Sequence, residues 1–212
     1  MRFILFIITF VIALLWPVTV SADPQPLIVS YNFGIFKEED TVVFYGEISN
    51  SSAFALIEVL GIENPETLVI MSPGGAMSGA LAIGEFLKNS DISVLIREET
   101  SCMSACAFAV MAANDLEIRG NLMFHTPYFP LVSTQETLDS LFLTSSVSHL
   151  ILIEWFVYNG YTLEFYRKIL ENTSITTYIN FTSTADFARY RSADPLQKLA
   201  ENEHPYTLVT LE

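Results

Sequence analysis

Leu68-Val69-Ile70-Met71-Ser72-Pro73-Gly74-Gly75 is the most informative stretch of this chain. Its four apolar residues form an unbroken run, which is typical of a strand that is covered on both faces. The Pro-Gly-Gly turn ends that strand, because proline cannot continue the hydrogen-bond ladder and glycine allows backbone conformations that other residues avoid. Apolar side chains at helical spacing follow over residues 80–87, so the stretch predicts a strand, a turn and a helix in succession.

The same alternation of strand and helix continues on both sides of this unit. It predicts an α/β fold with a mostly parallel sheet and helices on both of its faces. We expect further strands at residues 27–31, 41–48, 92–96, 116–118, 122–124 and 176–181. Further helices are expected at residues 51–60, 104–113, 137–158 and 162–170.

Two short segments supply side chains for chemistry. Cys102-Met103-Ser104-Ala105-Cys106 opens a helix of small residues, and Met123-Phe124-His125-Thr126-Pro127 ends an apolar strand. With the Gly-Gly turn they provide a backbone turn for an oxyanion, a hydroxyl nucleophile and a base, the three parts that acyl transfer needs. Both residues also have a structural interpretation: serine is a preferred helix N-cap, and a lone histidine is often a core or rim residue.

Cys102 and Cys106 are the only cysteines of the chain. Cysteines of exported proteins often form disulfides, and the N-terminal segment considered next indicates export. An i, i+4 pair on a regular helix, however, directs its sulfur atoms poorly for a bridge. We therefore expect two buried thiols beside Ser104. Zinc binding is not expected, because no matching pair of histidines accompanies the cysteines, and we expect no cofactor.

The N-terminus has the layout of a secretory signal peptide. Met1-Arg2 carries one positive charge, and residues 3–16 form an apolar run that contains a single threonine. Val20-Ser21-Ala22 has the small-residue pattern of a cleavage site. We expect cleavage after Ala22 and a single domain over residues 23–212, located in the periplasm or secreted. The alternative is an uncleaved membrane anchor, since the apolar segment is just long enough to span a bilayer.

The chain is strongly acidic, with 10 basic and 24 acidic residues and a formal net charge of −14. Loss of Arg2 with the signal peptide changes the charge to −15. Such a surface repels nucleic acid and anionic membranes, so neither is an expected partner.

These motifs together resemble the proteolytic subunit of Clp protease and its superfamily, the ClpP/crotonase fold. The resemblance covers residues 41–127, with weaker agreement to about residue 190. Ser72-Pro73-Gly74-Gly75 is similar to the family's turn, Ser104-Ala105-Cys106 to its nucleophile segment, and His125-Thr126-Pro127 to its His-x-Pro. A Ser-Ala-Cys segment after a signal peptide looks closest to the exported branch. The resemblance implies a superhelix of repeated β-β-α units followed by a helical region at residues 134–190.

The resemblance also implies a site, with Ser104 as nucleophile and His125 as base. The amides of Gly74 and Ala105 would form the oxyanion hole. The family's acid lies on the helix after the long helix, where an ungapped match places Ile169. Two polar side chains lie near this position but out of register with it. One of them could orient the histidine, a backbone carbonyl could do so, or the histidine could have no orienting group. The two polar side chains are Glu171 and Asn172.

Three functions remain open from the sequence. The first is an exported serine hydrolase, and the leading form of this hypothesis is a peptidase that acts on peptides or proteins. The second is a catalytically inactive relative that binds peptides or proteins. The third, an acyl-CoA enzyme of the crotonase branch, is disfavoured by export. Relatives of this fold commonly assemble into rings or trimers, which implies a homo-oligomer by analogy. An ATPase partner is not expected outside the cytoplasm.

Overall fold

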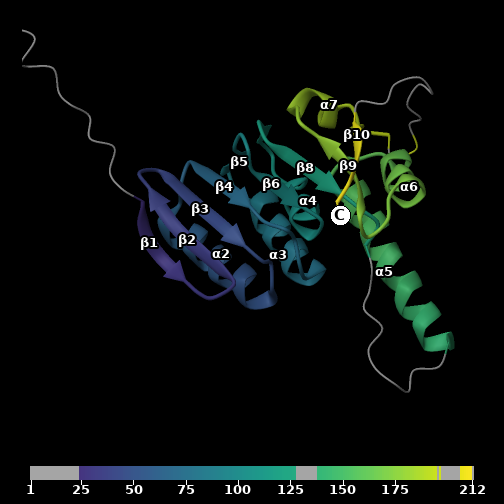
Figure 1. Ribbon diagram of the computed structural model, residues 1–212, viewed down its shortest axis with the longest axis horizontal. Helices are drawn as coiled ribbons and strands as arrows, with labels where there is room; N and C mark the ends of the chain where they lie inside the picture. The colour runs from purple at the N-terminus through teal and green to yellow at the C-terminus, as the bar shows by residue number, and fades with distance from the viewer. Residues whose placement is uncertain (1–23, 128–137, 195, 197–205, 212) are drawn as a thin grey trace, which may run out of the picture.

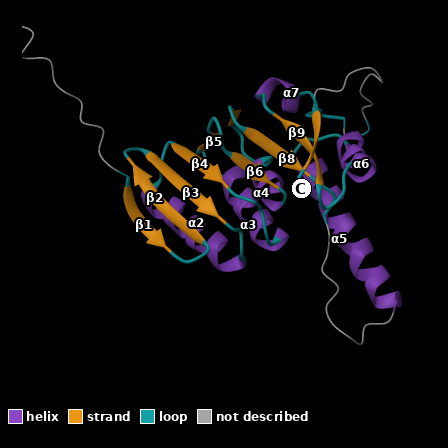
Figure 2. Ribbon diagram, in the orientation of Figure 1, coloured by secondary structure: helices purple, strands orange, loops and turns teal. Residues whose placement is uncertain are grey.

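The computed structural model of the protein describes residues 24–127, 138–194, 196 and 206–211 (Figure 1). The expected signal peptide, and with it the alternative of a membrane anchor, lies outside the described residues. The described part is a mixed α/β fold built on two sheets (Figure 2). None of its helices is both long and apolar enough to cross a membrane.

The larger sheet has six strands in the order β1-β2-β3-β4-β5-β7. Its first three strands form an antiparallel meander, and β3, β4, β5 and β7 are parallel. The central strands are apolar on both faces, as the unbroken run in β4 predicts. The strands are β1 (Gln25–Val29), β2 (Phe33–Glu38), β3 (Thr41–Gly46), β4 (Thr67–Met71), β5 (Ser93–Ile96) and β7 (Leu116–Ile118).

Three helices connect the parallel strands and pack against one another in sequence: α2 (Asn50–Glu63), α3 (Met77–Lys88) and α4 (Ala105–Val110). The expectation of helices on both faces of this sheet is wrong for these connections. Each new parallel strand is added on the same side of the previous one, so right-handed crossovers bring all three helices to one face.

The smaller sheet has the order β10-β9-β8-β6, in which only β6 and β8 are parallel. A parallel bridge between Ser72 and Cys102 joins the end of β4 to β6, so the two sheets meet beside the Pro-Gly-Gly turn. The strands are β6 (Ser101–Met103), β8 (Asn121–Phe124), β9 (Thr177–Phe181) and β10 (Thr207–Thr210).

Helices α5 (Leu138–Tyr158), α6 (Leu163–Asn172) and α7 (Thr184–Ala188) make up the C-terminal region. α5 extends away from the rest of the described structure (Figure 1). Where α5 and α6 meet β8 and β9, a set of buried rings packs edge to face and stacked. Its members are Phe108, Phe124, Phe156, Phe165, Phe181, Phe187 and Tyr190.

Three strands were not expected from the sequence. β2 lies between two of the expected strands, and its hairpin with β3 turns at Glu39 and Asp40, where Glu39 has a φ of +53°. β6 has only three residues and lies inside the segment that was expected to lead directly into a helix. β10 adds to the edge of the smaller sheet from a distant part of the sequence.

Candidate active site

Ser104 occupies a sharp elbow between β6 and α4. Its φ of +54° and ψ of −125° lie in a region that residues other than glycine rarely adopt. The Ser104 amide donates to the Met123 carbonyl oxygen (2.8 Å), and the Ser104 carbonyl accepts from the Ala107 amide (2.9 Å). The strained residue is therefore tied to the smaller sheet on one side and to the first turn of α4 on the other.

The side chain of Ser104 does not cap the helix that it precedes. Its Oγ lies 2.6 Å from Nε2 of His125 instead. The N-cap interpretation of this serine is thus wrong, and the structure brings together the two side chains that the sequence singles out for chemistry.

Strand register explains why these two residues meet. β6 and β8 are parallel neighbours, with Met103 paired to Met123. Ser104 is the next residue after one of these partners, and His125 lies two residues beyond the other. Both side chains therefore emerge at the carboxyl ends of adjacent parallel strands, where α/β folds usually place ligands.

His125 is buried, with only 4 % of its surface exposed. Desolvation lowers the pKa of its imidazole below the ordinary value of 6.5, and a hydrogen bond with the Thr126 backbone opposes this shift in part. The ring of Tyr178 packs edge-on against the imidazole at a centroid distance of 4.9 Å. A neutral imidazole at pH 7 is the form that can accept the Ser104 proton.

The Gly74 backbone lies against the elbow. Its φ is +99°, and a Cβ at this position would lie 2.7 Å from Cβ of Ser104 and 3.0 Å from the Ala105 amide nitrogen. Only glycine allows both this conformation and this close approach. Ala105 is the first residue of α4, so its amide is one of those that a helix leaves without an internal acceptor.

Ser72 takes part in this arrangement and was not predicted as a site residue. Its buried hydroxyl accepts a hydrogen bond from the Gly74 amide (3.0 Å). An oxyanion at this place would have to replace the Ser72 hydroxyl on that amide. The signal was present in the sequence, because a serine two residues before a glycine in a turn often accepts from its backbone.

The position expected to carry an acid holds Ile169, which is fully buried. Its carbonyl accepts from the Thr173 hydroxyl (2.7 Å), and that hydroxyl in turn accepts from the Thr126 amide (2.7 Å). The end of α6 therefore fixes the backbone next to His125 through threonines.

The two substitute candidates for the acid lie on the exposed side of α6. Glu171 forms an ion pair with Arg167 (2.5 Å), and the Asn172 side chain donates to the Lys168 carbonyl (2.9 Å). Neither of these two interactions involves His125.

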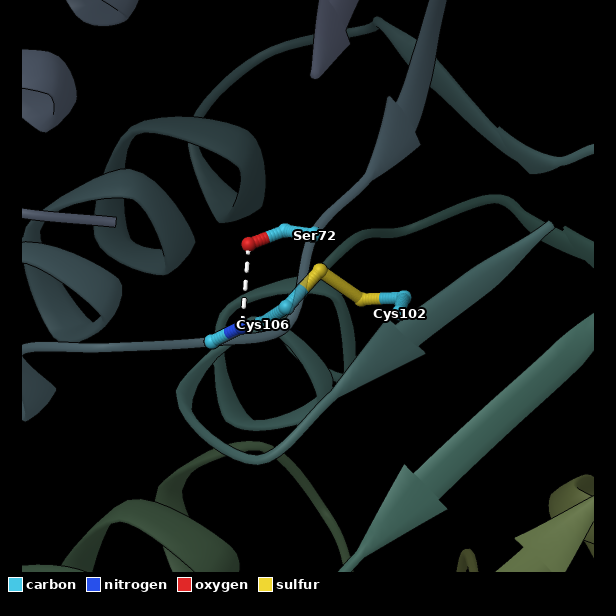
Figure 3. The surroundings of a disulfide bond; sticks show 4 residues. Ser72, Cys102 and Cys106 are labelled. Atoms are coloured by element: carbon cyan, nitrogen blue, oxygen red, sulfur yellow. Dashed lines mark hydrogen bonds between the residues drawn. A yellow bond between two sulfur atoms is a disulfide. The ribbon is translucent and has the colours of Figure 1, made fainter. Parts of the chain in front are cut away.

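The two cysteines form a disulfide, so the expectation of buried thiols is wrong. The geometric argument assumed that both residues lie on one regular helix. Cys102 instead lies in β6, and the elbow at Ser104 turns the chain so that Cys106 comes back over it, with the Cα atoms 5.3 Å apart. Figure 3 shows the bridge next to Ser72, whose dashed hydrogen bond is the one accepted from the Gly74 amide.

Within the described residues, no group of three or more His, Cys, Asp and Glu side chains is placed to hold a metal ion. The candidate site consists of a serine, a histidine, two backbone amides and a disulfide.

Comparisons of this chain with protein-family models and with curated proteins find no match.

Proposed function

We propose that this protein is an exported serine hydrolase that cleaves peptides with a Ser104–His125 pair. The observation that carries the proposal is the 2.6 Å contact between Ser104 Oγ and His125 Nε2 at a strained strand-to-helix elbow. Strained residues persist where the surrounding structure over-determines them, and they cluster at active sites.

The geometry supports acyl transfer in the following way. Nε2 of neutral His125 accepts the hydroxyl proton while Ser104 Oγ attacks the carbonyl carbon of the substrate. The negative charge on the carbonyl oxygen is stabilised by the Ala105 amide and by the Gly74 amide, which exchanges the Ser72 hydroxyl for the oxyanion. His125 then returns the proton to the leaving amine. In deacylation, His125 accepts a proton from a water molecule whose oxygen attacks the acyl carbon. The bond from that carbon to Ser104 Oγ then breaks, and His125 returns the proton to the serine.

A ClpP/crotonase-like superhelix is part of this proposal. Along the chain, β5 in the larger sheet is followed by β6 in the smaller sheet and then by α4. β7 and β8 repeat the same passage from one sheet to the other. This repetition of two strands and a helix supports the proposed relation to the ClpP/crotonase superfamily.

Export is supported by the disulfide, since such bonds persist in oxidising compartments and are rare in the cytosol. The apolar N-terminal segment supports it independently. We accordingly place the protein in the periplasm or outside the cell, with peptides as substrates and without an ATPase partner.

The second candidate is an inactive module that binds peptides at the same site. It is favoured by Ile169 at the position of the acid and by the engagement of Glu171 and Asn172 elsewhere. A serine–histidine pair without an acid keeps some activity, but removal of the acid from a serine protease lowers kcat by about 10⁴. Slow turnover is therefore expected even if the first candidate is right.

A fluorophosphonate probe tests the first candidate against the second, because it reacts once with an activated serine and does not require fast turnover. We expect the wild type to be labelled at Ser104, and expect Ser104→Ala and His125→Gln to abolish labelling while keeping the wild-type circular dichroism. Ser78→Ala, which removes an exposed serine of α3, is the matched control and should be labelled like the wild type. A folded wild type that no probe labels would favour the binding module.

A further inference from the structure

We propose that the Cys102–Cys106 disulfide positions Ser104 for reaction, so that the site reaches its full reactivity only in the oxidised protein. This inference rests on the proposed function, because it concerns the same serine. Nothing in the sequence motifs requires it, since the hydrolase motif consists of Ser104, His125 and the Gly-Gly turn.

The bridge encloses the elbow symmetrically. It joins the residue two positions before Ser104 to the residue two positions after it, across a Cα–Cα distance of 5.3 Å. The ring contains only five residues, and the strained one is at its centre. Any rotation of the Ser104 backbone toward a relaxed conformation must change the separation of Cys102 and Cys106, and the bridge prevents this.

Non-covalent contacts hold both sides of the elbow, and the disulfide links the two sides covalently. On the strand side, the Met103 amide donates to the Ser72 carbonyl (2.9 Å) and the Ser104 amide donates to the Met123 carbonyl (2.8 Å). On the helix side, the Ser104 carbonyl accepts from the Ala107 amide (2.9 Å), and all six residues of α4 are buried. The disulfide is the covalent link that fixes the start of this short helix to the strand.

A general stabilising role explains this bridge less well. The entropic stabilisation by a disulfide grows with the length of the loop that it closes, and this loop is among the shortest possible. Both cysteines are fully buried in the core, where small apolar residues would also pack. What the bridge constrains most strongly is the backbone of Ser104.

The proposal implies that the enzyme is about 10–100-fold less reactive before export than after it. Formation of the bridge removes two electrons and two protons from the two thiols. By thiol–disulfide exchange, these pass to a disulfide-containing oxidant, whose own bond is cleaved to two thiols. Such oxidants act in the compartment to which the signal peptide directs the chain. A peptidase constrained in this way would act only slowly on cytosolic peptides during its synthesis.

The test compares the wild type with the double variant Cys102→Ala/Cys106→Ala by the rate of fluorophosphonate labelling. We expect the maximal labelling rate to fall by about 10–100-fold, because small misplacements of a reacting group have effects of this size. The half-saturating probe concentration should stay unchanged, since both cysteines are fully buried and present no surface to the probe. Leu60→Ala, a buried change in α2 remote from the elbow, is the matched control and should lower the melting temperature without slowing labelling.

Wild type refolded with dithiothreitol provides a second sample with the native side chains. Its labelling should be slow and should recover when the thiols are reoxidised. This sample keeps the test decisive if the double variant does not fold. Labelling of the folded double variant or of the reduced wild type at the oxidised wild-type rate would overturn the proposal.

A readout without catalysis separates this inference from the proposed function. The ¹⁵N resonances of labelled histidine report the hydrogen bond between His125 Nε2 and Ser104 Oγ, with Ser104→Ala as the reference for its loss. We expect the His125 resonances of the double variant to move toward that reference. If the wild type is inert toward the probe, the proposed function fails, and the resonances still decide the positioning role. Resonances identical to those of the oxidised wild type would overturn it.

Discussion

The fold holds both Ser104 and His125 in unfavourable states. The serine has a positive φ, and the histidine is desolvated so that its pKa is lowered. The sheet fixes both states, since β6 and β8 run in parallel and end together. The short contact between Oγ and Nε2 therefore follows from the backbone rather than from flexible side chains.

The lowered pKa of His125 gives a pH prediction. The base must be neutral to accept the serine proton, so labelling should rise with pH and reach half its maximum below pH 6.5. The unfolded chain binds the proton more tightly than the folded one, so the free energy of unfolding should decrease as the pH falls below 6.5. The first effect is measured by labelling rates from about pH 4.5 to 8, a range that brackets the ordinary titration of histidine.

The control for the stability effect is His125→Gln, whose melting temperature should depend less on pH below the ordinary histidine value of 6.5. A labelling midpoint clearly above that value would contradict the desolvated environment of the imidazole.

A second prediction concerns the side chains nearest to the expected acid in the sequence. Glu171→Gln and Asn172→Ala should each leave the labelling rate within about twofold of the wild type, because both side chains are engaged on the exposed side of α6. Thr126→Val should slow labelling by about tenfold, since it removes the hydroxyl that contacts Thr173 next to the base. A loss of orders of magnitude in Glu171→Gln would show that the helix end rearranges to orient His125.

At the scale of elements, the alternation of strands and helices was predictable from local patterns. The apolar run of β4, the turn after it and the helices over residues 138–158 and 163–172 agree with their sequence signals. β6 was not predictable in this way, because three residues give no periodicity and β6 owes its existence to pairing with the distant β8. The disulfide was missed for the same reason, since it depends on that strand and on the elbow.

The turn between β4 and α3 gives a prediction at this scale. Gly74→Ala should lower the free energy of unfolding by about 1–3 kcal/mol, because alanine is strained at a φ of +99°. It should also slow labelling by at least about 10², since the new Cβ would lie at the Ser104 side chain and displace an oxyanion donor. Thermal melts and labelling rates measure the two effects.

Gly61→Ala is the matched control for this change. This glycine lies in α2, and no neighbouring atom comes within 4 Å of the place that an alanine methyl group would take. Alanine should therefore stabilise the helix by about 0.5–1 kcal/mol and leave labelling unchanged. Equal rates for Gly74→Ala and the wild type would remove the Gly-Gly turn from the proposed site.

At the scale of the whole molecule, the described structure leaves one helix face uncovered. α5 extends from the fold (Figure 1). Several of its large apolar side chains are exposed at helical spacing. They are Val147, Leu150, Ile151, Val157 and Tyr158. Contiguous exposed apolar surface of this kind marks interaction sites in soluble proteins. The homo-oligomer that the sequence resemblance implies would cover it.

The last prediction is that this face holds copies of the protein together despite their negative charge. The wild type should sediment as an oligomer, and Leu150→Lys/Ile151→Lys should shift it toward the monomer at the same protein concentration, because two charges would be buried in the interface. Added salt should strengthen wild-type association, since it screens the repulsion between chains with a net charge of −14 or −15. Phe54→Lys, at an exposed apolar position on α2, is the matched control and should leave the sedimentation unchanged. A monomeric wild type at all accessible concentrations would mean that the α5 face is covered by something other than a second copy.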